Sequence, residues 1–201
     1  MKSDVILVGG FHEIVELCDD CGLNVVGIID NEHVGSYYSI PIIGTDDDAE
    51  QLFPQYGSCK VVITPDDPKI REKLSAIYKA IGYEFATIIS PYAHISKYAE
   101  IGEGTVVQSG VYVSAATKIG HFCKLNSSCI VMHDDVIGDY TTIAPNAVLL
   151  GRVTTGYKSY IGANSTLLPN ISIGAGSTVG AGAVVTRNVE SGIIVKGVPA
   201  K

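Results

Sequence analysis

The sequence predicts a chain in two parts: a small parallel α/β domain over residues 1–88, then a parallel β-helix over residues 89–201. Strand-like and helix-like segments alternate through the first part, which is the pattern of a parallel sheet covered by helices. In the second part an aliphatic residue returns every six positions, a period that neither a helix nor a lone strand has. Glycine often follows that aliphatic residue directly, as in Ile101-Gly102.

Apolar runs and amphipathic runs take turns in the first part. A continuous apolar run such as DVILV predicts a strand that is buried on both faces. The next run, FHEIVELCDDCG, places its apolar residues on one helical stripe and stops at Gly22. In TDDDAEQLF, Thr45 can cap a helix whose first turn is acidic. The expected Rossmann-like order is strand 4–8, helix 11–22, strand 24–30, the run IPIIG leading into a helix at 45–53, strand 60–64, helix 68–82 and strand 84–89.

Candidate binding residues follow the strands of this first part. In parallel sheets, ligands bind beyond the carboxyl ends of the strands. The first strand ends in a glycine turn that opens a helix, where free amide groups and the helix dipole favour a phosphate. The turn is not a complete G-x-G-x-x-G, so a tight turn without a ligand is the alternative. The candidates are Gly9, Gly10 and His12, then Asp30 (placed to meet a ribose or base) and Asn31, then Thr64 and Asp66.

The repeat of the second part runs unbroken from Ile95 to Val185. Fifteen of the sixteen positions at this spacing are aliphatic, and Thr155 is the exception. Four residues after each, a small or branched residue is common, such as Thr117 or Ser159. Each six-residue unit is then a short strand plus a turn, with its aliphatic side chain in a narrow core and its backbone bonded to the neighbouring coils.

Composition excludes several classes of protein. The net charge is −7 and the positive charges are scattered, so we expect no nucleic-acid partner. No apolar run approaches the roughly 18 residues of a membrane span. The opening MKSDVILVGG lacks the features of a signal peptide, so we expect a cytoplasmic protein. Five cysteines suggest reduced thiols, and the C-x-x-C of Cys18 and Cys21 has no second pair to complete a zinc site.

One histidine stands out in the repeat. His133 lies two residues beyond Val131, where a side chain points outward, and Asp134 follows it. A histidine beside a carboxylate can act as a general base near neutral pH, and the alternative is a solvated surface histidine. His121 has no acid beside it, and Asp135 reads as a structural turn residue. The histidine spacing lacks the His-x-x-x-x-His pair of γ-class carbonic anhydrases, so we expect no metal.

The six-residue ladder, the closing VVTRNVESGIIVKGVPAK and the α/β domain together make the whole chain resemble the hexapeptide-repeat sugar acetyltransferases. More specifically, it is similar to the family of sialic acid O-acetyltransferase and bacillosamine (UDP-4-amino-sugar) N-acetyltransferase. The resemblance implies a left-handed β-helix with three repeats per coil and a little over five coils. It also implies a homotrimer, with acetyl-CoA in the groove between neighbouring β-helices.

A family motif of Leu-Asn, a small polar pair and then His with an acid matches LNSSCIVMHD at 125–134. By that match His133 is the general base, Asp134 orients it and Asn126 supports the same pocket. Relatives commonly read Gly-x-x-Gly-His-Gly in the first domain. The corresponding loop is shortened here, and His12 would take the part of the family histidine.

The resemblance also assigns the acetyl-CoA side of the site. It places the backbone amide that binds the thioester oxygen at Gly151, and the contacts to CoA at Ala163, Gly180 and Ala181. Some relatives hold the acetyl group with a second histidine nine residues after the first. Thr142 stands at that position, and its hydroxyl can donate a hydrogen bond but does not titrate near neutrality.

These features predict an acetyl-CoA-dependent acetyltransferase that acts on the amino group of a nucleotide-linked 4-amino sugar, with UDP as the expected nucleotide. The resemblance implies a place in glycan or surface-polysaccharide biosynthesis. Two alternatives stay open: O-acetylation of a sugar such as sialic acid by the same residues, and a non-catalytic trimeric scaffold that binds a nucleotide sugar.

Overall fold

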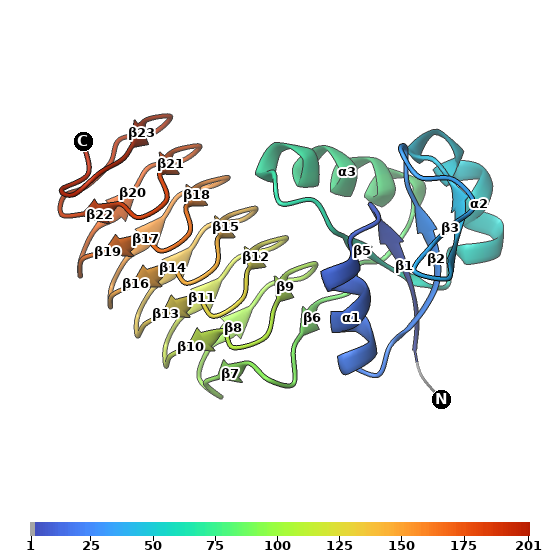
Figure 1. The fold of residues 1–201 in the computed structure, drawn as a ribbon, viewed down its shortest axis with the longest axis horizontal. Helices are drawn as coiled ribbons and strands as arrows, with labels where there is room; N and C mark the ends of the chain where they lie inside the picture. The colour runs from blue at the N-terminus through green and yellow to red at the C-terminus, as the bar shows by residue number, and fades with distance from the viewer. Residues whose placement is uncertain (1–2) are drawn as a thin grey trace.

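The computed structural model describes residues 3–201 and shows an α/β domain packed against one side of a β-helix (Figure 1). Five strands of the α/β domain form one sheet in the order β3-β4-β2-β1-β5, parallel except between β3 and β4. The strands are β1 (Asp4–Val8), β2 (Asn24–Ile29), β3 (Ser36–Tyr37), β4 (Ile40–Gly44) and β5 (Lys60–Ile63). The helices are α1 (His12–Asp20), the 3-10 helix η1 (Asp46–Asp48), α2 (Ala49–Tyr56) and α3 (Pro68–Ile81).

Most of the α/β elements lie where the sequence predicts them, and their ends have local causes. Asp67 caps α3 by accepting from the amide of Lys69, and Gly82 ends it in the left-handed region at φ +114°. The helix expected at 45–53 is divided, because Thr45 and Asp48 form a capping box around the short turn η1 before α2 begins.

The prediction that residues 84–89 form the last strand of the α/β sheet is wrong. Phe85 makes only an isolated bridge with Val61, and β6 (Ile88–Ile89) pairs instead with β9 as the first strand of the β-helix. Ile89 stands one six-residue step before Ile95, so the ladder begins one unit earlier than Ile95. Ile88 faces the α/β domain and is buried in its core, which explains why the run looks like a strand of either part.

Eighteen strands, β6 to β23, make three parallel sheets in the described part of the chain, here called sheets 1, 2 and 3. Sheet 1 holds β6, β9 (Val106–Val107), β12 (Lys124–Leu125), β15 (Thr142–Ile143), β18 (Tyr160–Ile161), β21 (Thr178–Val179) and β23 (Ile194–Val195). Sheet 2 holds β7 (His94–Ile95), β10 (Tyr112–Val113), β13 (Ile130–Val131), β16 (Val148–Leu149), β19 (Thr166–Leu167) and β22 (Val184–Val185). Sheet 3 holds β8 (Glu100–Ile101), β11 (Lys118–Ile119), β14 (Val136–Ile137), β17 (Thr154–Thr155) and β20 (Ser172–Ile173).

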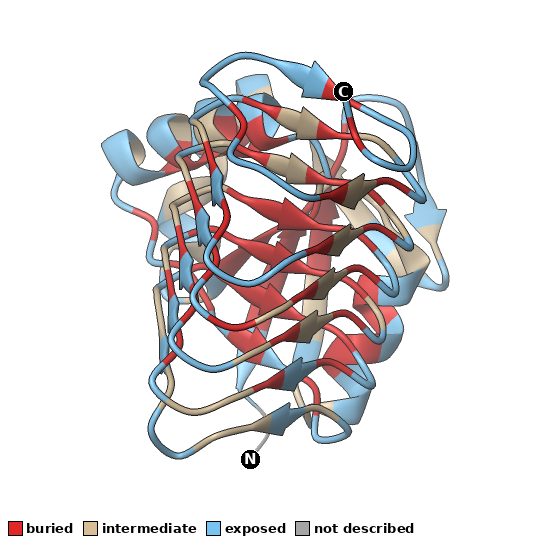
Figure 2. Ribbon diagram, turned by 90° about the vertical axis from the view of Figure 1, so that its left-hand side faces the viewer, coloured by how far each residue is buried: buried red, intermediate tan, exposed pale blue. Residues whose placement is uncertain are grey.

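The register repeats every eighteen residues, so one coil holds three six-residue units, as the left-handed β-helix requires. Val131 pairs with Val113 in the coil before it and with Leu149 in the coil after it. Sheet 1 has seven strands, more than the expected five coils and a fraction, because β6 and β23 extend the stack at its two ends. Figure 2 shows buried residues along the strands of each coil and exposed residues at its corners.

The core of the β-helix is the predicted file of aliphatic side chains. Leu125, Val131, Ile143 and Leu149 are fully buried within it. Thr155, the exception in the ladder, is buried in the same file, with its hydroxyl 3.4 Å from that of Thr141. Among the helices described over residues 3–201, none is long and apolar enough to cross a membrane.

Candidate active site

A pocket of about 510 Å³ opens at the carboxyl ends of β1, β2 and β5. The β-helix closes one side of it, because Lys124 of sheet 1 is part of its lining. His12 lies outside the lining, at the start of α1, where its ring stacks on that of Tyr38. Six of the predicted binding residues line the pocket: Gly9, Gly10, Asp30, Asn31, Thr64 and Asp66.

The glycine turn is built by close contacts that exclude side chains. Gly9 has φ +95°, and a β-carbon there would overlap the hydroxyl group of Thr64. Contrary to expectation, the amides of the two glycines are not free. Gly9 donates to the carbonyl of Ile29 (2.9 Å), and Gly10 donates to the Asp30 carboxylate (2.5 Å).

The free amide groups lie one step further along the chain, in the first turn of α1. Within residues 3–201, the N–H groups of Phe11, His12 and Glu13 have no hydrogen-bond acceptor, and no side chain caps this helix. Unpaired N–H groups and the positive end of the helix dipole favour an anion. The unpaired amides that could hold a phosphate therefore begin at Phe11, after the two glycines.

Asp30 joins two loops at the rim of the pocket. Besides the Gly10 amide, its carboxylate accepts the backbone N–H groups of Glu32 (2.8 Å) and His33 (2.9 Å), and lies 3.1 Å from Nδ1 of His33. Burial acts to raise the pKa of Asp30, but these hydrogen bonds outweigh it and the pKa lies below its ordinary value. Asp30 thus organises the loops that the sequence assigned to nucleotide contact.

Lys124 is a pocket residue that the sequence did not single out. Its side chain is 1% exposed, and its ammonium group donates to the carbonyl of Thr64 (2.6 Å) and to Oδ1 of Asp66 (2.8 Å). Burial lowers the pKa of Lys124, while the Asp66 carboxylate acts to raise it. The sequence did contain one signal for this residue. Ile88, Val106 and Lys124 take the same outward-facing position in successive coils, and the apolar residues at the first two indicate that this face is covered.

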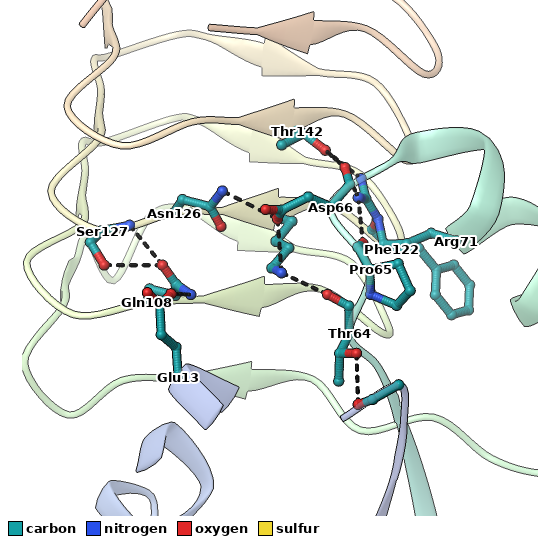
Figure 3. Close-up of polar contacts among 12 residues, drawn as sticks. Glu13, Thr64, Pro65, Asp66, Arg71, Gln108, Phe122, Asn126, Ser127 and Thr142 are labelled. Carbon is teal, nitrogen blue, oxygen red and sulfur yellow. Dashed lines mark hydrogen bonds and ion pairs between the residues drawn. The ribbon is translucent and has the colours of Figure 1, made fainter. Parts of the chain in front are cut away.

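Asn126 and Arg71 hold the same pocket wall from two sides (Figure 3). Nδ2 of Asn126 donates to Oδ1 of Asp66 (3.3 Å), whereas its buried Oδ1 has no partner among the described residues. Arg71 is 2% exposed and donates to the carbonyl groups of Pro65 (3.0 Å), Asp66 (2.7 Å), Phe122 (2.9 Å) and Tyr140 (2.7 Å). The loop at 64–66 is therefore fixed to the β-helix.

Thr142 lies in this domain junction, which differs from its expected place beside the acetyl group. It is fully buried, its hydroxyl donates to the carbonyl of Asp66 (2.7 Å), and it accepts from Arg71 (2.9 Å). A hydroxyl group has one proton to donate. Because that proton is already used within the chain, Thr142 cannot also donate it to an acetyl group in this arrangement.

His133 and Asp134 lie at the corner between sheets 2 and 3. Nδ1 of His133 is 2.7 Å from Oδ2 of Asp134, and the two side chains are 48% and 52% exposed. Asp134 adopts a left-handed conformation, with φ +61°, in the turn after β13. The carboxylate therefore fixes the tautomer with the proton on Nδ1 and leaves Nε2 as the free, basic nitrogen.

Gly151 lies one coil further on, against the imidazole ring of His133. A β-carbon at Gly151 would come within 2.6 Å of both Cε1 and Nε2 of His133, so a glycine lets the ring and backbone approach. The Gly151 N–H has no acceptor in the part of the chain that the structure describes. A free N–H beside a free basic nitrogen can stabilise an oxyanion next to a general base.

The residues expected to contact CoA lie at a different corner. Ala163 and Ala181 are one coil apart at the corner between sheets 1 and 2, where the carbonyl of Ala163 accepts from Gly182 (2.8 Å). Gly180 precedes Ala181 and donates to the carbonyl of Val195. One copy of the chain does not bring these residues together with His133.

Comparison with known proteins agrees with the fold. The family model for the bacterial transferase hexapeptide (six repeats) matches residues 153–187. No curated protein sequence matches the chain significantly. Among solved structures, PerB from Caulobacter crescentus, in complex with CoA and GDP-perosamine, is 29% identical with a TM-score of 0.94, covering 99% of this chain and 96% of that one.

Two further structures are similar over nearly their whole length. The acetyltransferase domain of PglB from Neisseria gonorrhoeae is 27% identical with a TM-score of 0.94, covering 100% of this chain and 99% of that one. WeeI from Acinetobacter baumannii is 28% identical with a TM-score of 0.89, covering 99% of both chains. The family match and these structures agree with the resemblance of the chain to the hexapeptide-repeat sugar acetyltransferases.

Proposed function

We propose that the protein transfers the acetyl group of acetyl-CoA to the amino group of a nucleotide-linked amino sugar. The observation that carries this proposal is the contact between Gly151 and His133, which places a free N–H group beside a histidine held by Asp134. Its relatives support the acceptor class, since PerB was solved with CoA and GDP-perosamine. They also include histidine variants of that perosamine N-acetyltransferase.

In this proposal residues 1–88 hold the nucleotide sugar and residues 89–201 supply the acetyl-CoA site. The free amides of Phe11, His12 and Glu13 would bind the diphosphate at the positive end of α1. Lys124 uses two of its three N–H groups within the chain and has one left for the ligand. A UDP-4-amino sugar is the substrate we favour for this pocket.

His133 would act as the base. The sugar ammonium must first lose one proton to the solvent, because only the neutral amine can attack the thioester carbon. As the amine attacks, its nitrogen loses a second proton, and Nε2 of His133 would take up this proton. As the carbon–sulfur bond breaks, His133 returns the proton to the departing sulfur. Asp134 stabilises the intervening imidazolium, and a base of this kind contributes about 10²–10⁴-fold in rate. The Gly151 N–H would stabilise the charge on the thioester oxygen, worth roughly 10²–10³-fold.

The proposed active unit is a homotrimer with its sites between copies. The pocket opens against sheet 1, whereas His133 lies at the corner between sheets 2 and 3 of the same β-helix. A substrate in the pocket would therefore meet the His133 of a second copy. Mixing His133→Ala with Lys124→Met tests this at a low sugar concentration, where the second variant binds little substrate. Mixed trimers should be more active than either variant alone, and a lack of recovery would count against shared sites.

The reaction itself is tested by release of free thiol from acetyl-CoA. We expect turnover with UDP- or GDP-linked 4-amino sugars, and its loss in His133→Ala but not in the matched surface variant His94→Ala. Turnover of His133→Ala near the wild-type rate would refute the mechanism. Activity on sialic acid but not on amino sugars would establish O-acetylation instead. The five cysteines are free thiols, which suits the reducing cytoplasm that we propose as the location.

A further inference from the structure

A charged side chain lies in the interior of the β-helix directly beside the proposed base. The residue four positions after each ladder aliphatic points inward, and Asp135 is the one charged residue among the sixteen such positions from Ala99 to Val189. Asp135 is fully buried. The residues stacked below and above it, Thr117 and Val153, are neutral.

The Asp135 carboxylate links the two segments that carry the proposed chemistry. Its Oδ2 accepts the N–H of Met132 (3.0 Å), the residue before His133. Its Oδ1 accepts the N–H of Val153 (2.7 Å), two residues after Gly151. The same segments are joined once more, because Arg152 donates to the carbonyl of His133 (3.0 Å).

A carboxylate in this position carries a cost that the other coils avoid. Burial raises the pKa of Asp135 to about 7, although the Val153 and Met132 amides act to lower it. In the described part of the chain no cation bridges to it, and the charged groups that act on it are His133 and Asp134 of its own turn. Burying an ion without a counter-ion is unfavourable, so a purely structural position would be better filled by a neutral residue, as elsewhere in the repeat.

We infer that Asp135 is a positioning residue for catalysis: it clamps the turn that carries His133 to the segment that carries Gly151. The clamp sets the position of the base relative to the oxyanion donor, which must be held within a few tenths of an ångström for efficient catalysis. This inference rests on the proposed function. Asp135 itself does not touch the reacting atoms.

The test is Asp135→Asn, which keeps the volume but leaves one oxygen to accept two N–H groups. We expect kcat to fall about 10- to 100-fold, as misplacement of catalytic groups does. We also expect an unchanged KM for the nucleotide sugar and faster hydrogen exchange of the Val153 amide. Asp135→Thr, which installs the residue type of Thr117, is the second variant should the asparagine fold poorly. Ser159→Ala removes a buried side chain hydrogen bond at an equivalent position of another corner and should leave kcat unchanged.

The outcomes separate the two hypotheses. If the wild type transfers acetyl groups and folded Asp135→Asn and Asp135→Thr do so at the same kcat, the positioning role is overturned and the proposed function stands. If both variants lose stability and kcat falls no more than in Ser159→Ala, Asp135 is structural only. If the wild type transfers no acetyl group to any amino sugar, both the function and the inference fail.

Discussion

Lys124 and Asp66 form an ion pair of 2.8 Å across the boundary between the two domains, with the Lys124 side chain 1% exposed and the Asp66 side chain 47% exposed. The pair joins a strand of the β-helix to the loop that forms one wall of the substrate pocket. The position of that wall therefore depends on the β-helix as well as on the sheet of the α/β domain.

Lys124→Met should weaken nucleotide-sugar binding. The change removes a buried cation that lines the pocket and leaves the Thr64 carbonyl without its partner. Loss of a charged hydrogen bond to a phosphate is worth about 1.5–3 kcal/mol, so we expect the Kd to rise about 10- to 100-fold. Calorimetry with a UDP-sugar measures this. Lys118→Met, on the exposed face of sheet 3, is the control, and an equal loss in both variants would contradict a specific role.

Gly151→Ala should lower kcat while the fold is kept. The added methyl group would come within 2.6 Å of the His133 ring and push the imidazole away from the free N–H. Displacing the base from its oxyanion donor should cost about 10²-fold in kcat. Steady-state kinetics measure kcat, and thermal unfolding followed by circular dichroism shows whether the fold is kept. Arg152→Ala, at the adjacent exposed position, should keep its rate, and a wild-type rate for Gly151→Ala would rule out the proposed geometry.

Arg71→Met should destabilise the junction between the domains. The guanidinium group donates to four backbone carbonyls and to the Thr142 hydroxyl, and burial lowers the pKa of Arg71 to about 10. Each buried acceptor left unpaired costs about 1–3 kcal/mol, so the melting temperature should drop clearly. Arg71→Lys should rescue little, because one ammonium group cannot reach the same spread of acceptors.

The matched control for Arg71 is Lys69→Met, an exposed cation in the first turn of the same helix. Melting temperatures of the three variants, together with the KM for the nucleotide sugar, measure the effect. If Arg71→Met melts at the same temperature as Lys69→Met, the junction does not depend on these hydrogen bonds.

Local patterns could predict the β-helix and the position of His133, because a six-residue period fixes which side chains point inward. The same patterns could not assign Ile88 and Ile89, since an apolar strand fits either domain. The sequence also could not predict the part of the site that forms where the two domains pack together. Lys124 and Thr142 are outward-facing residues of the repeat, and the α/β domain covers them only in the folded chain.

The roles of the glycine turn and Asp135 show a second limit of the sequence. A glycine turn before a helix indicates a phosphate site, but only the structure shows that the free amides begin at Phe11. Asp135 could be read as a turn residue from its place after Asp134. Its bond to Val153 joins residues of neighbouring coils, and that pairing follows from the stacking.

Asp135 should make the stability of the protein depend on pH. The folded-state pKa of about 7 lies above the ordinary value of 3.8, so between these pH values the folded chain binds more protons than the unfolded chain. Stability is then lost as the pH rises through this interval, because ionising the buried carboxylate disfavours the fold. Relative to the wild type, Asp135→Thr should therefore gain stability as the pH rises from about 4 to about 7. Urea unfolding of both proteins at each pH measures the difference, in which the contributions of His133 and other shared groups largely cancel. Ser159→Ala should follow the wild-type slope, and parallel curves for Asp135→Thr and the wild type would show that Asp135 ionises at its ordinary pKa.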